Sequence, residues 1–202
     1  MNEAQTRAEL IDPKLKEAGW GIVESSKILR EFKVTKGKLQ TGRGRAKPLF
    51  ADYVLYYKGR KLATMEAKSD EKEIGEGVGQ AKDYAIKLHL DYTFASNGNE
   101  IYQICMETGK EGPIDKFPTP DELWNKTFKI KNDWKEKFNA VPRGGIYEPY
   151  FFQEIATNKT LDAIAENKHR LLLTLATGTG KTTIAFQIAW KLFQARWNLK
   201  RD

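Results

Sequence analysis

The chain has 202 residues and a formal net charge of +7 at pH 7. Hydrophobic residues make up 40% of it and aromatic residues 11%, which excludes a disordered chain and fits one large domain or one domain and part of a second. A single cysteine excludes an intrachain disulfide framework and a cysteine-cluster zinc site, and the presence of only two histidines argues against a histidine metal site. The sequence lacks a membrane span and a secretory signal, so we expect a cytoplasmic protein without a membrane partner.

Basic residues concentrate between Lys27 and Lys47. This segment contains eight Lys or Arg residues and one acid, Glu31. Such a density of positive charge is typical of a surface that binds DNA, because contacts with phosphates release condensed counterions. A solvated lysine-rich loop is the alternative.

Apolar spacing predicts the elements of the first half of the chain. A helix over 3–18 is expected to kink or split at Asp12-Pro13 and to end at Gly19. Further on, a tight turn at Lys58-Gly59-Arg60 joins two strands, and Asn97-Gly98-Asn99 joins two more. The predicted ranges are strands at 20–23, 28–34, 50–57, 61–68, 92–95 and 101–106, and a helix at 76–90.

Proline and glycine interrupt residues 111–149, which we interpret as a connection between domains. This connection holds aromatic residues such as Trp124 and Trp134, so we expect it to pack on something, with a short helix opening after Pro120. The elements predicted after it are a helix at 151–166, a strand at 170–175 and a helix at 182–194.

The first candidate site combines two carboxylates and a lysine. Glu66 and Lys68 are two residues apart on one strand, so their side chains leave the same face. If the preceding turn has three residues centred on Gly59, Asp52 lies directly opposite Glu66, with Cβ atoms ~5 Å apart. Carboxylates at that distance repel unless a divalent cation such as Mg²⁺ lies between them. The alternative is an ordinary polar face of an edge strand.

The helix predicted next carries two residues that suit the same site. Gln80 and Tyr84 are four residues apart and share a helix face. A glutamine side chain orders metal-bound water or phosphate, and a tyrosine donates its hydroxyl. Near the N-terminus, Glu3 is a further acid for this site, with Glu9 as the competing choice.

These residues resemble the PD-(D/E)xK nuclease core with the Gln-x3-Tyr motif of its RecB-like branch. The residues that carry the resemblance are Asp52, Glu66-Ala67-Lys68 and Gln80-Ala81-Lys82-Asp83-Tyr84-Ala85. The opening Asn2-Glu3-Ala4-Gln5-Thr6-Arg7 and Gly19-Trp20 resemble the first helix of the restriction (R) subunit of type I restriction–modification enzymes. The phrase Phe117-Pro118-Thr119-Pro120-Asp121-Glu122-Leu123-Trp124 resembles the nuclease-to-motor connection of that family. Ala51 stands where many such nucleases have a proline before the aspartate.

The resemblance implies Mg²⁺-dependent hydrolysis of phosphodiester bonds in double-stranded DNA. Asp52 and Glu66 would hold the metal, with the Ala67 carbonyl as a third ligand, and Lys68 would orient or activate water. The residues implied to support metal-bound water and phosphate are Gln80 and Tyr84. Whether one or two metal ions bind is left open.

The second candidate site is a nucleotide-binding loop between the last predicted strand and helix, Ala176-Thr177-Gly178-Thr179-Gly180-Lys181-Thr182. In this context, backbone N–H groups face the phosphates of a nucleotide, Lys181 reaches the outer phosphates and Thr182 coordinates Mg²⁺. A strict P-loop has glycine at the position of Leu175, yet the loop is similar to motif I of superfamily 2 helicases.

The segment Pro149-Tyr150-Phe151-Phe152-Gln153 resembles the adenine-reading Q-motif of the same helicases. The resemblance implies that Gln153 bonds the adenine edge of ATP. Buried core aromatics are the alternative interpretation of Tyr150, Phe151 and Phe152.

We therefore expect an α/β chain with a PD-(D/E)xK core, in which helices flank a mixed sheet, followed by the first part of a RecA-like superfamily 2 motor domain. The expected boundaries are 1–112 for the nuclease domain, 113–148 for the connecting segment and 149–202 for the motor. Because the sequence contains no second RecA-like half, we expect a fragment of a longer translocase that does not hydrolyse ATP alone.

The family resemblance also implies partners: double-stranded DNA, and the modification (methyltransferase) and specificity subunits that choose the site. ATP would act in the complete subunit. Two alternatives stay open, a helicase–nuclease of DNA repair and a DNA-binding module with an inactive nuclease site.

Overall fold

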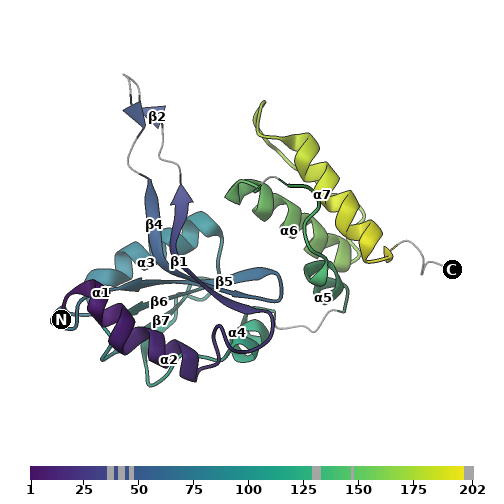
Figure 1. Ribbon diagram of the computed structural model, residues 1–202. Helices are drawn as coiled ribbons and strands as arrows, with labels where there is room; N and C mark the ends of the chain where they lie inside the picture. Colours follow the sequence, from purple (N-terminus) through teal and green to yellow (C-terminus); the bar gives the residue numbers. More distant parts are fainter. Residues whose placement is uncertain (36–38, 41–43, 46–47, 129–132, 147, 198–202) are drawn as a thin grey trace. The chain divides into compact units, whose positions relative to one another are not determined.

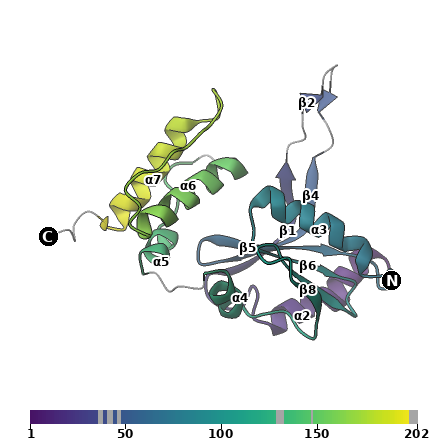
Figure 2. The ribbon, with the colours of Figure 1, turned by 180° about the vertical axis from the view of Figure 1, so that it is seen from behind.

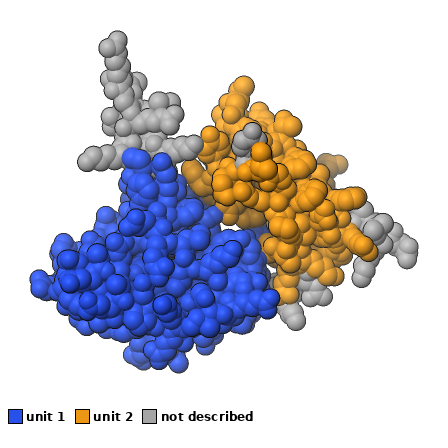
Figure 3. Space-filling model, in the orientation of Figure 1, with its two compact units in different colours: residues 1–129 blue, residues 130–202 orange. Residues whose placement is uncertain are grey.

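The computed structural model describes residues 1–35, 39–40, 44–45, 48–128, 133–146 and 148–197. The chain forms two compact units, residues 1–129 and 130–202 (Figure 3). The division between them lies inside the segment that the sequence assigned to the connection. Among the described residues, no helix is both long and apolar enough to cross a membrane.

A six-stranded mixed sheet forms the centre of the first unit (Figure 1). Its strand order is β1-β4-β5-β6-β7-β8, and every neighbouring pair is antiparallel except β5 and β6. The parallel pair follows from the helix α3 (Gly75–Leu88) between them, since parallel strands need a crossover connection. The strands are β1 (Ser26–Thr35), β4 (Leu49–Tyr57), β5 (Arg60–Ala67), β6 (Tyr92–Ser96), β7 (Ile101–Cys105) and β8 (Glu111–Ile114), with a separate short pair, β2 (Leu39–Gln40) and β3 (Gly44–Arg45).

Helices cover both faces of this sheet, which confirms the predicted mixed sheet flanked by helices. The N-terminal helical segment lies on one face and α3 on the other (Figures 1 and 2). Ile11 and Leu15 of the N-terminal segment are fully buried with Tyr53 and Met65 in the main core. On the opposite face, the Thr93 hydroxyl of β6 donates to a carbonyl of α3.

The predicted N-terminal helix forms, with a wider turn in its middle. It consists of α1 (Glu3–Thr6), the π-helical η1 (Arg7–Ile11) and α2 (Asp12–Glu17). The Asp12 N–H donates to the carbonyl of Arg7, five residues earlier. Because Pro13 has no N–H and its ring crowds the preceding turn, a π-helical turn accommodates it.

The hairpin of β4 and β5 confirms the predicted strands but not the predicted turn. Tyr57 pairs with Arg60, so the loop contains two residues, Lys58 and Gly59. Both have positive φ, at 45° and 78°, as a type I′ hairpin turn requires. The register shifts between Leu55 and Tyr56, and this irregularity restores the strand pairing that a three-residue turn would have produced.

The strand predicted at 20–23 is instead a run of turns. The N–H groups of Ile22 and Val23 both donate to the carbonyl of Gly19, so no strand ladder forms there. Trp20 is fully buried and donates from its indole nitrogen to the Pro118 carbonyl at 2.8 Å. Packing against this distant segment, rather than strand pairing, explains the apolar pattern.

Residues 111–128 add a strand and a helix to the first unit. β8, which the sequence did not predict, pairs with β7. The predicted short helix is α4 (Pro120–Thr127), which begins at a capping box between Thr119 and Glu122. Leu123 and Trp124 are buried in the core of the first unit, so this part of the predicted connection packs on the sheet domain.

The second unit is helical in its described residues. The predicted helices are present as α6 (Phe151–Ala165) and α7 (Lys181–Gln194), preceded by α5 (Asp133–Ala140). The strand predicted at 170–175 is wrong: this segment is irregular, and Leu172 is 91% exposed. The described part of this unit contains no other strand, so the backbone donors of this segment have no ladder partner.

Candidate metal and nucleotide sites

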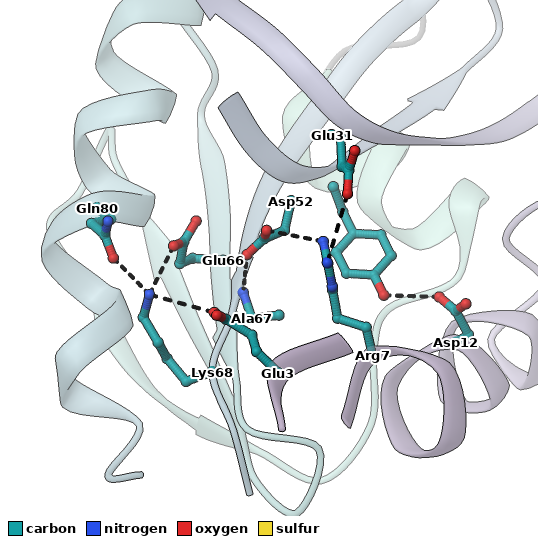
Figure 4. Close-up of polar contacts among 10 residues, drawn as sticks. Glu3, Arg7, Asp12, Glu31, Asp52, Glu66, Ala67, Lys68 and Gln80 are labelled. Atoms are coloured by element: carbon teal, nitrogen blue, oxygen red, sulfur yellow. Dashed lines mark hydrogen bonds and ion pairs between the residues drawn. The ribbon is translucent and has the colours of Figure 1, made fainter. Parts of the chain in front are cut away.

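Three carboxylates converge at one end of the β4–β5 hairpin (Figure 4). Glu3 of α1, Asp52 of β4 and Glu66 of β5 each offer one oxygen, and these oxygens lie within 4.8 Å of one another. We call these three residues the acidic triad. The structure thus brings Asp52 and Glu66 together, as the strand register predicted. It also places Glu3 in this group, whereas Glu9 is exposed and lies outside it.

The ammonium of Lys68 lies among these acids. It donates to Oε1 of Glu66 at 2.9 Å and to Oε1 of Gln80 at 2.7 Å, and it lies 3.8 Å from Oε1 of Glu3. Gln80 comes from α3, which approaches the strand end closely at Gly77. A Cβ at Gly77 would lie 3.4 Å from Cγ of Lys68, so the small residue brings α3 against the site.

Tyr84 lies one turn beyond Gln80 on α3 and is 7% exposed. Burial raises the pKa of its hydroxyl, and the nearby charges of Glu66 and Asp52 raise it further. The hydroxyl is therefore neutral at pH 7 and able to donate a hydrogen bond.

Glu66 is the most buried acid of the triad, and one of its oxygens is unpaired. The residue is 5% exposed, and its Oε2 has no hydrogen-bond partner among the described residues. Burial raises its pKa to about 7, the neighbouring Asp52 raises it as well, and Lys68 opposes the shift. A buried, unpaired polar atom costs about 1–3 kcal/mol, so this position favours a bound cation or a proton.

Both oxygens of Asp52 are engaged. Oδ2 accepts the backbone N–H of Ala67 at 2.8 Å, and Oδ1 accepts from the Arg7 guanidinium at 3.2 Å. Burial raises the pKa of Asp52, while these two contacts lower it. The Ala67 backbone thus lies beside Asp52, and coordination of a metal by its carbonyl stays a prediction.

Sequence reasoning missed Arg7. The signal was available, because Arg7 follows Glu3 by four residues and residues at that spacing lie on one side of a helix. Because Glu3 was a candidate for the site, Arg7, one helical turn later, was a candidate for the same site.

The candidate nucleotide-binding loop has the backbone that its glycines predict. Gly178 and Gly180 have positive φ, at 78° and 77°, and α7 begins at the next residue, Lys181. The glycines let the chain turn so that the helix N-terminus opens at the loop. Thr182 lies exposed in the first turn of α7, beside the exposed Lys181.

Gln153 of α6 contacts this loop directly. Its Nε2 donates to the Thr179 carbonyl at 2.9 Å, and its Oε1 accepts from the Tyr150 N–H at 3.0 Å. A side chain at Gly180 would collide with the same amide. Gln153 is therefore positioned at the loop, and its contact with adenine stays a prediction.

The basic segment predicted to bind DNA is described only in part. Lys27, Arg30 and Lys33 are exposed on β1, and Arg30 is paired with Asp12 at 3.0 Å. The remaining basic residues of the segment have side chains outside the described part of the chain: Lys36, Lys38, Arg43, Arg45 and Lys47.

Comparisons with known proteins cover the whole chain. Residues 146–200 match the family described as "Type III restriction enzyme, res subunit". The type I restriction enzyme EcoAI endonuclease subunit of Escherichia coli is 35% identical over 100% of this chain and 26% of its own length. The EcoKI endonuclease subunit of Escherichia coli strain K12 is 22% identical over 97% of this chain and 22% of its own length.

A solved fragment structure assigned to an HsdR subunit of a type I restriction enzyme from Vibrio vulnificus YJ016 has the same fold. Its TM-score is 0.87 at 39% identity, over 98% of this chain and 39% of that chain. The chain thus spans about a quarter of the length of the curated relatives it matches. Along its whole length, the chain is a homologue of the endonuclease subunits of type I restriction enzymes.

Proposed function

We propose that residues 1–129 are a Mg²⁺-dependent nuclease with a PD-(D/E)xK core that hydrolyses phosphodiester bonds of double-stranded DNA. The observation that carries this proposal is the buried Oε2 of Glu66, which lies beside Asp52 and Lys68 and has no hydrogen-bond partner in the described part of the chain. Homology to subunits named endonucleases supports it.

The donor set fits a hard divalent cation. Mg²⁺ prefers one or two carboxylates together with waters and phosphate oxygens. Asp52 and Glu66 offer the carboxylates, and the Ala67 carbonyl is the proposed third ligand. When bound, Mg²⁺ supplies positive charge at the phosphate and lowers the pKa of a coordinated water.

The other side chains orient the reacting groups. Lys68 lies close enough to both Glu66 and Glu3 to hold an attacking water near the carboxylates. Gln80 restrains the Lys68 ammonium through a 2.7 Å hydrogen bond. The neutral hydroxyl of Tyr84 is suited to donate to a phosphate oxygen, whose negative charge grows as the phosphodiester is attacked.

The second unit is proposed to begin an ATP-dependent DNA motor. Its loop offers the backbone N–H groups of Gly178, Thr179 and Gly180 and the side chains of Lys181 and Thr182 to the phosphates of ATP and to Mg²⁺. In the proposed restriction complex, modification and specificity subunits choose the DNA site, and the motor translocates the DNA to the nuclease.

Cleavage of an unmodified supercoiled plasmid tests the nuclease assignment. The full-length protein, assembled with modification and specificity subunits and given ATP and Mg²⁺, is compared with its Asp52→Asn and Lys68→Met variants. We expect either change to lower cleavage by about a hundredfold or more, with ATP hydrolysis retained as evidence of folding.

Lys87→Met is the matched control, because Lys87 is a partly exposed lysine of α3 whose ion pair is with Asp83. It should cleave as the wild type does. Equal cutting by all four proteins would contradict the catalytic assignment and leave a DNA-binding module with an inactive site.

A further inference from the structure

Arg7 lies between two acids from different strands (Figure 4). Its guanidinium is 3.2 Å from Oδ1 of Asp52 on β4 and 3.7 Å from Oε1 of Glu31 on β1. The Arg7 and Asp52 side chains are 24% and 21% exposed, so water screens the contact between them only in part, whereas the Glu31 side chain is 73% exposed. An arginine is charged at every physiological pH, and it thus forms a permanent cation beside the acidic triad.

The backbone at Glu31 is unusual. Its φ is 50°, a left-handed conformation that is uncommon for a residue with a Cβ. The β1–β4 ladder has Arg30 opposite Tyr53 and Phe32 opposite Ala51, so Glu31 lies between these pairs, across from Asp52. A non-glycine residue in this conformation next to a cluster of charges indicates a functional constraint.

The charges of the whole cluster match one divalent cation. Four carboxylates contribute to it, and the two cations are Arg7 and Lys68, so its formal charge is −2 when all groups are ionised. One divalent cation neutralises this charge, whereas two would leave the site positive. The four carboxylates are Glu3, Glu31, Asp52 and Glu66.

The hydrogen bonds at these carboxylates also favour a single bound metal ion. Arg7 occupies Oδ1 of Asp52, the oxygen with which this carboxylate would bind a second ion. Oε2 of Glu66, for which the described residues offer no hydrogen-bond partner, remains for the first ion.

We propose that Arg7 takes the place of a second metal ion, so that the nuclease site binds one divalent cation, and that Glu31 positions Arg7. This inference rests on the proposed function, since it assigns the metal stoichiometry of the same site. It predicts that removing the guanidinium opens a second cation site between Asp52 and Glu31.

Counting bound Mn²⁺ by electron paramagnetic resonance tests this directly. Mn²⁺ replaces Mg²⁺ as the probe, and the full-length protein is used without nucleotide so that the ATP loop has no phosphates to bind the metal. Sites at the acidic triad are those that disappear in the Asp52→Asn variant. We expect one such Mn²⁺ in the wild type and two in Arg7→Gln.

Two further variants separate the roles of Arg7 and Glu31. Arg7→Gln combined with Glu31→Gln should return the count to one, because the second site loses a carboxylate. Arg7→Lys should also bind one, because it keeps the positive charge. Thermal unfolding of each variant shows that it is folded before ions are counted.

Each remaining outcome has a defined meaning. Two Asp52-dependent Mn²⁺ ions in the wild type would overturn the inference, and this measurement needs no variant of Arg7. A single Asp52-dependent ion in a folded Arg7→Gln protein would overturn it as well. A wild type that binds no more Mn²⁺ than Asp52→Asn would instead refute the proposed metal site itself.

Discussion

The ammonium of Lys68 lies 2.9 Å from Oε1 of Glu66, two residues earlier in the chain. Both side chains are shielded from water, at 14% and 7% exposure, so the contact is a charge-assisted hydrogen bond in a region of low dielectric. The pair satisfies one oxygen of Glu66 and leaves the other unpaired among the described residues. The stability of the first unit and its proposed metal binding are therefore coupled at this carboxyl group.

The raised pKa of Glu66 predicts that this residue makes the metal-free protein more stable at low pH than at high pH. Its pKa rises from 4.5 in the unfolded chain to about 7 in the folded protein, chiefly because of burial. The folded state thus holds this proton more tightly, and the stability it confers is full below pH 4.5 and is lost as pH rises through about 7. We expect this group to contribute on the order of 2 kcal/mol across that window.

Urea unfolding in the presence of EDTA, followed from pH 5 to pH 8, measures this effect. The Glu66→Gln variant has no proton to lose at this position, so its unfolding free energy should fall less over the same range. An identical pH dependence in both proteins would show that Glu66 does not titrate as its burial predicts.

Metal removal should destabilise the first unit at pH 8. A cation that binds the folded state alone stabilises it by about 1.4 kcal/mol at ten times its dissociation constant. Thermal unfolding with Mg²⁺ and with EDTA is the measurement, and the midpoint should be higher with Mg²⁺. The Asp52→Asn variant should have lost most of this difference, and an undiminished difference in it would place the stabilising ion elsewhere.

The strands and helices around the acidic triad were predictable because their signals are local. Apolar alternation predicted β4 and β5, and helical spacing predicted α3. The proximity of Asp52 and Glu66 followed from the short connection between their strands. The turn itself was predicted with one residue too many, and a bulge beside Tyr56 compensated for it.

Features that depend on distant partners were not predictable in this way. Arg7 and Glu31 are 24 positions apart in the sequence and come together only in the folded chain. The residue type of Glu31 does not predict its positive φ, whereas a glycine at that position would have suggested one. The apolar run at 170–175 has the pattern of a strand, but a strand forms only where another one can pair with it.

The turn after β6 should be sensitive to a single methyl group. A Cβ at Gly98 would lie 2.6 Å from Cβ of Leu10 in η1, and Gly98 has φ of 85°. Gly98→Ala combines backbone strain with a collision against a helix, so we expect a loss of about 2–4 kcal/mol in unfolding free energy. Chemical denaturation measures it.

Gly109→Ala is the matched control for this change. Gly109 has φ of 70°, yet nothing lies within 4 Å of its added Cβ, so strain alone should cost about 1 kcal/mol. Equal losses in the two variants would mean that the contact of this turn with η1 contributes nothing.

Gln80 should act on cleavage through Lys68. Its Oε1 accepts from the Lys68 ammonium at 2.7 Å, and Gln80→Leu removes this acceptor while it keeps a side chain of similar size. Lys68 would then be restrained mainly by Glu66, and we expect plasmid cleavage to fall by about tenfold, with ATP hydrolysis unchanged. Gln80→Glu keeps the acceptor and should retain more activity than Gln80→Leu. The reverse order would mean that an acceptor for the Lys68 ammonium is not what cleavage requires of Gln80.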